Sequence, residues 1–282
     1  MRAVLTPTNL QELFSMLEQY PAALPIAGGT DLLVLLRQNG LRDRRPLLSL
    51  AEIQELQGIR EKGGTLSIGA ASTFSRIIAD PLIAEHAPLL ARAASTIGGP
   101  AIRNMATLGG NICTASPAGD SLTPLHVLAA KVEIASPAAK RIMPIEHFIV
   151  GPGRTALREG EILTRILLPR YASFPDYGFE KIGRRRAMAI AVTSFAGLVR
   201  RAADGTIETA RFAWGSVGPT VVRIPSLEQA LVGAKLDADY LCQVAQIVAS
   251  RVAPISDVRA TADYRRMLAA NLTVRFLEGL LD

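Results

Sequence analysis

Hydrophobic positions near the start of the chain follow a helical period. Four apolar residues share one face of the helix that this spacing predicts: Leu10, Leu13, Phe14 and Leu17. Thr8 and Gln11 have the spacing of a capping box at its start, and Tyr20-Pro21 ends it. The first segment of the chain is therefore expected to form a strand followed by an amphipathic helix.

A strand, a helix and a second strand are expected next. An apolar run at 24–27 predicts a short strand that leads into a Gly-Gly pair. The apolar stretch 31–38 predicts a helix, with Asn39-Gly40 as its stop signal. Residues 46–50 are the next strand candidate. Helices and strands thus alternate in this first part of the chain.

The pattern changes after Gly63, where short strand-like runs are separated by Gly, Pro and Ser. Residues 66–68 and 131–134 alternate apolar with polar side chains, which is typical of half-buried strands. One helix is expected at 87–96. The region is therefore predicted to be α+β.

A proline-rich segment at 169–175 is the expected hinge between two domains. The sequence predicts a first domain at 1–175, with subdomains at about 1–58 and 59–175, and a second domain at 176–282. No internal repeat or low-complexity tract is evident.

The second domain begins with strand patterns and ends with helical ones. Three strands are expected, at about 177–182, 190–200 and 208–217. A turn at 203–205 joins the last two, and Trp214 is expected to pack in the core of this sheet. Two helices, at 237–251 and 261–279, close the chain.

Composition places the 282 residues among ordinary globular proteins, with 49% hydrophobic and 20% charged residues. The longest apolar runs, such as 32–36, are far shorter than the roughly 20 residues that cross a bilayer. The first residues lack the apolar core of a secretory signal. A cytoplasmic protein without a membrane span is therefore expected.

Candidate metal ligands and nucleophiles are few. Cys113 and Cys242 are too few for a disulfide framework or for a cluster held by four thiolates, and the three histidines lack metal-ligand spacing. Cys113 is expected to be a small buried residue. The net charge of +6 is spread along the chain without interleaved aromatic residues. We therefore predict no metal site, no catalytic residue of its own and no nucleic-acid partner.

Two Gly-Gly pairs are the sequence features that point most clearly to a ligand-binding site. The first, in Ala27–Asp31, lies between a predicted strand and a predicted helix, where bare N–H groups and the helix N-terminus form an anion cradle. A plain tight turn is the alternative. The second pair, in Thr107–Ile112, is followed by Asp120, a candidate acceptor for ribose hydroxyls. Neither the dinucleotide fingerprint nor the P-loop spacing is present, so two cradles around one diphosphate are expected.

Five segments together resemble the FAD-binding medium subunit of the molybdenum hydroxylases, which include xanthine dehydrogenases, aldehyde oxidoreductases, nicotinate dehydrogenases and carbon monoxide dehydrogenases. These segments span the whole chain: Ala27–Asp31, Ile102–Ile112, Ser116–Asp120, Gly178–Arg184 and Tyr264–Arg266. The resemblance implies an α+β protein with a two-part FAD-binding domain of the vanillyl-alcohol-oxidase type. The resemblance also implies that a small three-stranded sheet packed with helices follows the FAD-binding domain.

The resemblance also implies the residues that bind FAD. The first cradle meets the diphosphate with Leu24, Pro25, Ile26, Ala27, Gly28, Gly29, Thr30 and Asp31. The second cradle consists of Thr107, Leu108, Gly109, Gly110 and Asn111. Four further contacts are implied: Ile97 before the second cradle, Asp120 on the ribose or adenine side, Leu163 as an apolar wall, and Lys181 beside the flavin ring.

Two of these contacts have other interpretations. A cation beside the flavin favours the reduced form, which supports the role of Lys181, although an exposed strand lysine is the alternative. Leu163 is equally compatible with a core residue. Arg184–Arg186 has three possible contacts: a partner subunit, the phosphates of a nicotinamide nucleotide, or solvent.

By resemblance, this chain carries FAD and transfers electrons. A small subunit supplies them from [2Fe–2S] clusters, a large subunit binds molybdopterin and the substrate, and NAD is a common acceptor. An inserted cluster in this chain is excluded, because two cysteines are too few to hold it. A self-contained FAD-dependent oxidase or reductase and a non-catalytic scaffold are the alternatives.

Overall fold

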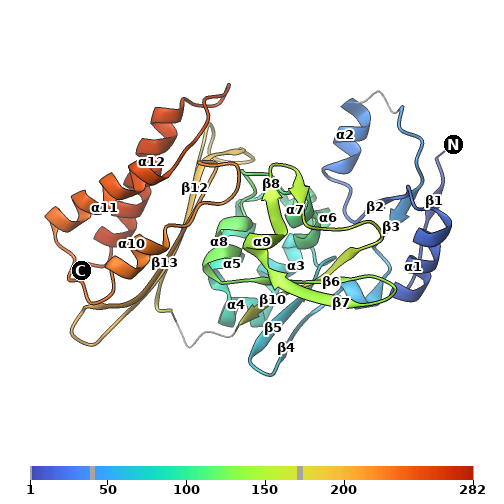
Figure 1. The fold of residues 1–282 in the computed structure, drawn as a ribbon, viewed down its shortest axis with the longest axis horizontal. Helices are drawn as coiled ribbons and strands as arrows, with labels where there is room; N and C mark the ends of the chain where they lie inside the picture. The colour runs from blue at the N-terminus through green and yellow to red at the C-terminus, as the bar shows by residue number, and fades with distance from the viewer. Residues whose placement is uncertain (1, 39–41, 170–173, 282) are drawn as a thin grey trace.

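The computed structural model describes residues 2–38, 42–169 and 174–281. Figure 1 shows three parts along the long axis of the molecule. The N-terminal part lies at one end, the C-terminal sheet and its helices lie at the other, and the remaining elements lie between them. No helix among the described residues is long and apolar enough to cross a membrane.

The N-terminal part is a small parallel sheet of order β1-β3-β2 with two helices. Its elements are β1 (Val4–Leu5), α1 (Leu10–Gln19), β2 (Leu24–Ile26), α2 (Leu32–Gln38) and β3 (Leu47–Ser49). These elements match the predicted strands and helices. The expected stop at Asn39-Gly40 lies outside the described residues.

The predicted cap of α1 was wrong by one residue. Asn9, and not Thr8, is the N-cap, and its side chain accepts a hydrogen bond from the Glu12 backbone N–H at 2.9 Å. The Glu12 carboxylate accepts from the Thr8 backbone N–H at 2.8 Å. An ionised carboxylate is a stronger acceptor than the amide of Gln11, which fixes the register of the cap.

The central part contains a five-stranded antiparallel sheet of order β4-β5-β10-β6-β7. Its strands are β4 (Ile59–Lys62), β5 (Thr65–Gly69), β10 (Ile162–Pro169), β6 (Lys131–Ala135) and β7 (Lys140–Pro144). The two runs with alternating polarity thus form β5 and β6, as predicted. A short 3-10 helix (Gln54–Leu56) precedes the sheet, and α9 (Ile145–Phe148), β8 (Ile149–Gly151) and β9 (Arg154–Thr155) follow β7.

Six short helices lie between β5 and β6, where the sequence predicted only one. They are α3 (Phe74–Ala79), α4 (Pro81–His86), α5 (Pro88–Ser95), α6 (Pro100–Met105), α7 (Leu108–Thr114) and α8 (Leu122–Val127). Only α5 matches the predicted helix. The others have six or seven residues each, too few for a helical period to stand out from the pattern.

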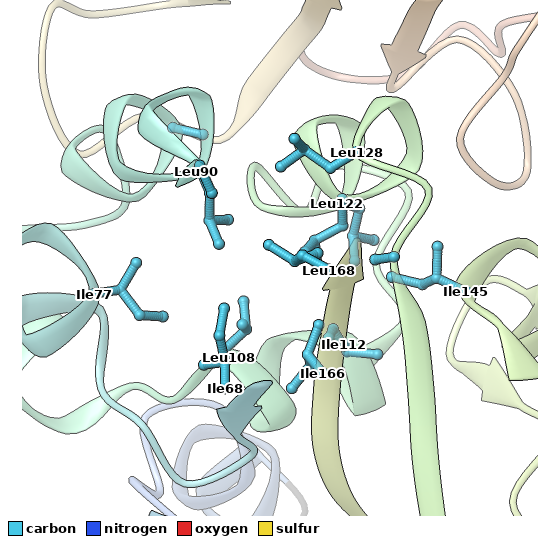
Figure 2. Close-up of a cluster of buried hydrophobic side chains, with 14 of the residues drawn as sticks. Ile68, Ile77, Leu90, Leu108, Ile112, Leu122, Leu128, Ile145, Ile166 and Leu168 are labelled. Atoms are coloured by element: carbon cyan, nitrogen blue, oxygen red, sulfur yellow. The ribbon is translucent and has the colours of Figure 1, made fainter. Parts of the chain in front are cut away.

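The main hydrophobic core lies between these helices and the central sheet. Figure 2 shows the side chains that meet there, and all of its labelled residues are fully or almost fully buried: Ile68, Ile77, Leu90, Leu108, Ile112, Leu122, Leu128, Ile145, Ile166 and Leu168. Helix α7 contributes Leu108 and Ile112 to this core. The core therefore fixes α7, which carries the second glycine pair.

The C-terminal part is an antiparallel sheet of order β11-β12-β13 covered by three helices. Its elements are β11 (Asp176–Gly183), β12 (Ala191–Arg201), β13 (Ile207–Gly215), α10 (Pro225–Ala230), α11 (Ala238–Arg251) and α12 (Ala262–Glu278). Asp237 and Thr261 cap the last two helices. Trp214 is fully buried in this second core, as predicted, and donates a hydrogen bond to Thr273 Oγ1 at 2.9 Å.

Candidate functional site

A cleft of about 1200 Å³ lies where the three parts of the molecule meet. The loop after β2, the start of α7 and the loop that leads to Asp120 form one part of its wall. Lys181 of β11, the start of β12 and the segment 216–219 form another part. The cleft therefore brings together one glycine of each pair, Gly29 and Gly110, and the three titratable residues that the sequence predicted for the site, Asp31, Asp120 and Lys181.

In the first glycine turn, the two glycines have different tasks. Gly29 lines the cleft and has a φ of 69°, a left-handed conformation that side chains disfavour. A Cβ atom on Gly28 would lie 1.7 Å from the carbonyl oxygen of Met105, so this glycine allows the turn to pack on the end of α6. The backbone N–H groups of Gly29, Thr30 and Asp31 donate to no acceptor within the described part of the chain. The first turn thus offers open donors to a bound anion.

The second glycine turn is arranged differently. Thr107 is the N-cap of α7, and its Oγ1 accepts a hydrogen bond from Gly110 N at 3.1 Å. The N–H groups of Leu108 and Gly109 donate to the carbonyl oxygens of Ser72 and Ala70. Gly110 lines the cleft, whereas a Cβ atom on Gly109 would lie 2.6 Å from the Cβ atom of Ala70. The N–H groups of this turn already have partners within the chain. The turn therefore offers space beside the cleft and not open hydrogen-bond donors.

Replacing Thr107 with alanine is expected to lower the free energy of unfolding by about 1 kcal/mol, because α7 loses its N-cap. Urea unfolding of the purified chain measures this change. The Thr107→Ser variant keeps the hydroxyl group and is the matched control, so equal losses in both variants would show that the cap is not the cause.

Asp31 connects the two turns. Its Oδ2 atom accepts a hydrogen bond from Thr114 Oγ1 at 3.1 Å, and Thr114 is the last residue of α7. The Thr114 hydroxyl also lies 3.0 Å from the carbonyl oxygen of Gly110. The carboxylate of Asp31 therefore joins the N-terminal part to the central part at the edge of the cleft.

Lys181 and Asp120 form a buried ion pair across the boundary of the central and C-terminal parts. The Nζ atom of Lys181 lies 2.5 Å from Asp120 Oδ2 and 3.1 Å from the carbonyl oxygen of Thr96. Both side chains are 9% exposed. Burial raises the pKa of Asp120 to about 6, although the charge of Lys181 and its hydrogen bond act in the opposite direction. Asp120 Oδ1 is buried without a hydrogen-bond partner among the described residues, so one acceptor remains for a ligand.

Most of the predicted site residues line the cleft. They are Pro25, Ile26, Ala27, Gly29, Thr30, Asp31, Ile97, Thr107, Gly110, Asn111, Asp120 and Lys181. The remaining ones do not line it: Leu24, Gly28, Leu108, Gly109 and Leu163. Leu163 of β10 is 4% exposed and packs in the main core. A contact between Leu163 and the flavin therefore stays a prediction.

The sequence analysis missed the part of the cleft wall that α12 and the segment before it provide. Arg265 is 3% exposed and donates to the carbonyl oxygens of Val192 and Ser216, at 2.6 and 3.2 Å, and to Asp257 Oδ1 at 2.7 Å. Hydrogen bonds, first from the Arg259 backbone, hold the pKa of Asp257 well below its usual range. The helical spacing of Arg265 from the buried residues Ala269 and Leu272 was the available signal.

The lining residues of the cleft include no histidine, and the described residues contain no group of three His, Cys, Asp or Glu side chains placed to hold a metal. Cys113 was expected to be buried, but it is half-buried and lines the cleft, and desolvation raises the pKa of its thiol to about 12. This arrangement can bind and orient a cofactor.

Fold and cleft together define a flavoprotein subunit, and comparison with known families identifies it. The model described as the FAD-binding domain in molybdopterin dehydrogenase matches residues 1–171. The CO dehydrogenase flavoprotein C-terminal domain matches residues 179–280. The chain belongs to the family of FAD-binding subunits of molybdenum hydroxylases, so the family and the α+β fold expected from the sequence are confirmed.

Individual relatives are similar over almost their whole length. A xanthine dehydrogenase FAD-binding subunit of Escherichia coli O157:H7 is 36% identical over 277 residues, which cover 95% of this chain and 92% of the relative. The carbon monoxide dehydrogenase medium chain of Hydrogenophaga pseudoflava is 30% identical and covers 97% and 94%. The structure of quinoline 2-oxidoreductase from Pseudomonas putida 86 superposes with a TM-score of 0.93 at 29% identity, covering 100% of this chain and 99% of that one.

Proposed function

We propose that this chain is the electron-transfer subunit of a molybdenum-containing hydroxylase or dehydrogenase. It takes electrons from the [2Fe–2S] clusters of a small partner subunit and passes them to NAD or another acceptor. A large subunit then binds the molybdopterin and the organic substrate. The observation that carries this proposal is the meeting of both glycine turns with Asp120 and Lys181 at one cleft.

The cleft fits FAD on two observations. The open N–H groups of Gly29, Thr30 and Asp31 suit the diphosphate, since backbone donors that follow a strand and precede a helix bind anions. Gly110 leaves room on the opposing wall that a larger side chain would fill. We therefore assign Gly29, Thr30 and Asp31 to diphosphate binding and Gly110 to close approach.

Lys181 and Asp120 are assigned to the flavin end or the adjoining ribose. The bound flavin supplies the chemistry that accepts and releases electrons. Lys181 is fixed by Asp120 and by the carbonyl oxygen of Thr96, so its ammonium group stays at the cleft wall. Asp120 Oδ1 is available as an acceptor for a ligand hydroxyl or N–H group. Asp120 thus both positions the lysine and offers one acceptor to the ligand.

The names of two relatives support the place of this chain in a larger enzyme. One is an FAD-binding subunit of a xanthine dehydrogenase, and the other is the medium chain of a carbon monoxide dehydrogenase. We place the boundary between the two domains near residue 175, between the stretches that the two family models match.

Anaerobic addition of NADH to the FAD-loaded chain tests the acceptor. If NAD is the physiological acceptor, NADH is expected to bleach the absorption of the bound flavin, because the transfer runs in both directions. Dithionite is the control for reducibility. A flavin that dithionite bleaches and NADH does not would contradict NAD as the acceptor.

Co-purification tests the partners. A tagged chain expressed with the genes that adjoin its own is expected to bring down one protein with [2Fe–2S] clusters and one with molybdopterin. A chain that purifies alone under these conditions, with its FAD bound, would contradict the proposed assembly and favour a self-contained flavoprotein.

A further inference from the structure

A second cavity, of about 690 Å³, adjoins the cleft. Gly98, Lys181, Met188 and Ala189 line both. The end of α5, the start of α6 and the loop after β11 border the second cavity, which is open to solvent on one side. A molecule bound there therefore lies next to a molecule bound in the cleft.

Arginines dominate the wall of this second cavity, which we call the arginine pocket. Four of them line it: Arg92, Arg103, Arg185 and Arg186. None of the four forms an ion pair with a carboxylate in the described ranges, and the pocket lining includes no Asp or Glu. The charge of Lys181, by contrast, is balanced by Asp120. Arg92, Arg185 and Arg186 are solvent-exposed and Arg103 is half-buried, so the four charges form a positive surface that attracts an anion.

Backbone carbonyl groups hold two of these arginines in place. Arg103 Nη1 donates to the carbonyl oxygens of Ile97 and Gly98, both at 3.1 Å. Arg185 Nε donates to the carbonyl oxygen of Met188 at 3.1 Å. These contacts restrict the side chains without neutralising their charge, which lowers the entropy cost of binding an anion. Arg92 and Arg186 have no side-chain hydrogen bond to another described residue and keep all their donors for a ligand.

The neighbouring Arg184 differs from this set. Its Nη1 atom donates to the carbonyl oxygen of Val258 at 3.1 Å, and it does not line the pocket. The three consecutive arginines of the sequence are thus divided, with Arg185 and Arg186 in the pocket and Arg184 outside it. Arg184 carries the same charge a few ångströms along the chain, which makes it a matched control.

The geometry points to the arginine pocket as the site that binds the diphosphate of the dinucleotide electron acceptor. The volume suits a small molecule rather than a protein surface. Guanidinium groups bind phosphate oxygens with two parallel hydrogen bonds, and four of them match a ligand with more than one negative charge. This inference rests on the proposed function, because it assumes a nicotinamide dinucleotide as acceptor.

Calorimetric titration of the FAD-loaded chain with ADP-ribose tests the pocket. ADP-ribose carries the diphosphate but cannot exchange electrons, so binding is measured apart from reduction. We expect binding to weaken about tenfold or more in each of the variants Arg92→Gln and Arg186→Gln, as loss of a charge-assisted hydrogen bond does. The Arg184→Gln control is expected to change it less than about twofold, and all three variants are expected to keep FAD.

Three outcomes would overturn the inference. The first is a chain that retains FAD but does not bind ADP-ribose. The second is an equal loss of affinity in all three variants, which would indicate a general effect of surface charge. The third concerns electron transfer. Bleaching by NADH that is unchanged in Arg92→Gln and Arg186→Gln would refute the pocket and leave NAD as the acceptor. Arginine-dependent binding of ADP-ribose without bleaching by NADH would support the pocket and refute the acceptor.

Discussion

Replacing Gly110 with leucine is expected to release FAD from the chain. Gly110 lines the cleft at the first turn of α7, and even a single Cβ atom there would lie 2.9 Å from Thr107 Oγ1. The rest of a leucine side chain has to extend into the space assigned to FAD, because the N-cap and the core fix α7 on its other sides. We expect the affinity for FAD to fall at least about a hundredfold, which corresponds to roughly 2.7 kcal/mol.

Flavin content per chain, measured after purification and again after addition of FAD, checks this result. Gly279→Leu is the matched control, because Gly279 is exposed at the end of α12, far from the cleft lining. The control is expected to keep its FAD. A Gly110→Leu chain that folds and binds FAD stoichiometrically would show that the diphosphate does not approach α7.

Replacing Lys181 with methionine is expected to destabilise the chain in a pH-dependent way. The variant leaves Asp120 buried without its counter-ion, a change that costs about 3–5 kcal/mol when the carboxylate is ionised. Loss of the lysine also removes the influence that lowers the pKa of Asp120, so this pKa rises above about 6. The folded state then holds the proton more tightly than the unfolded state does, and stability falls as the pH rises between the two pKa values.

Urea unfolding at about pH 5 and about pH 8 separates these effects. We expect a large loss of stability at the higher pH and a much smaller one at the lower pH, where Asp120 is protonated in the folded variant. Adding Asp120→Asn to Lys181→Met is expected to restore most of the stability at the higher pH. Losses that are equal at both pH values, or a double variant without rescue, would contradict the assignment of a buried ion pair.

The bound flavin gives a second measurement on the same variant. Lys181→Met is expected to keep FAD but to lower its reduction potential, because a cation near the reduced flavin is lost. Spectroscopic titration against a redox dye measures this potential. An unchanged potential would place Lys181 away from the flavin ring.

Sequence patterns predicted the long elements well because local signals define them. Helices α11 and α12 begin at the cap residues Asp237 and Thr261, and α12 ends at Gly279, as expected. The short helices between β5 and β6 escaped prediction because tertiary packing stabilises them more than their own sequence does. The five helices that were not predicted have about two turns or fewer, and all of them except α6 bury apolar residues in a core that the sequence alone does not reveal.

The site shows the same division between local and long-range information. Both glycine pairs were found from the sequence, but the role of Gly28 depends on Met105, whose backbone at the end of α6 lies against the turn. Lys181 and Asp120 were predicted as separate contacts. Their ion pair joins residues 61 positions apart and became visible only in the fold.

The amount and identity of the flavin in the wild-type chain test the central claim most directly. The chain is purified, denatured, and the released flavin is identified by chromatography and counted per chain. We expect FAD, at one molecule per chain, either as purified or after addition of FAD to a chain that lost it. A chain that does not take up FAD, or that releases a different flavin, would contradict the proposed cleft and its assignment to FAD.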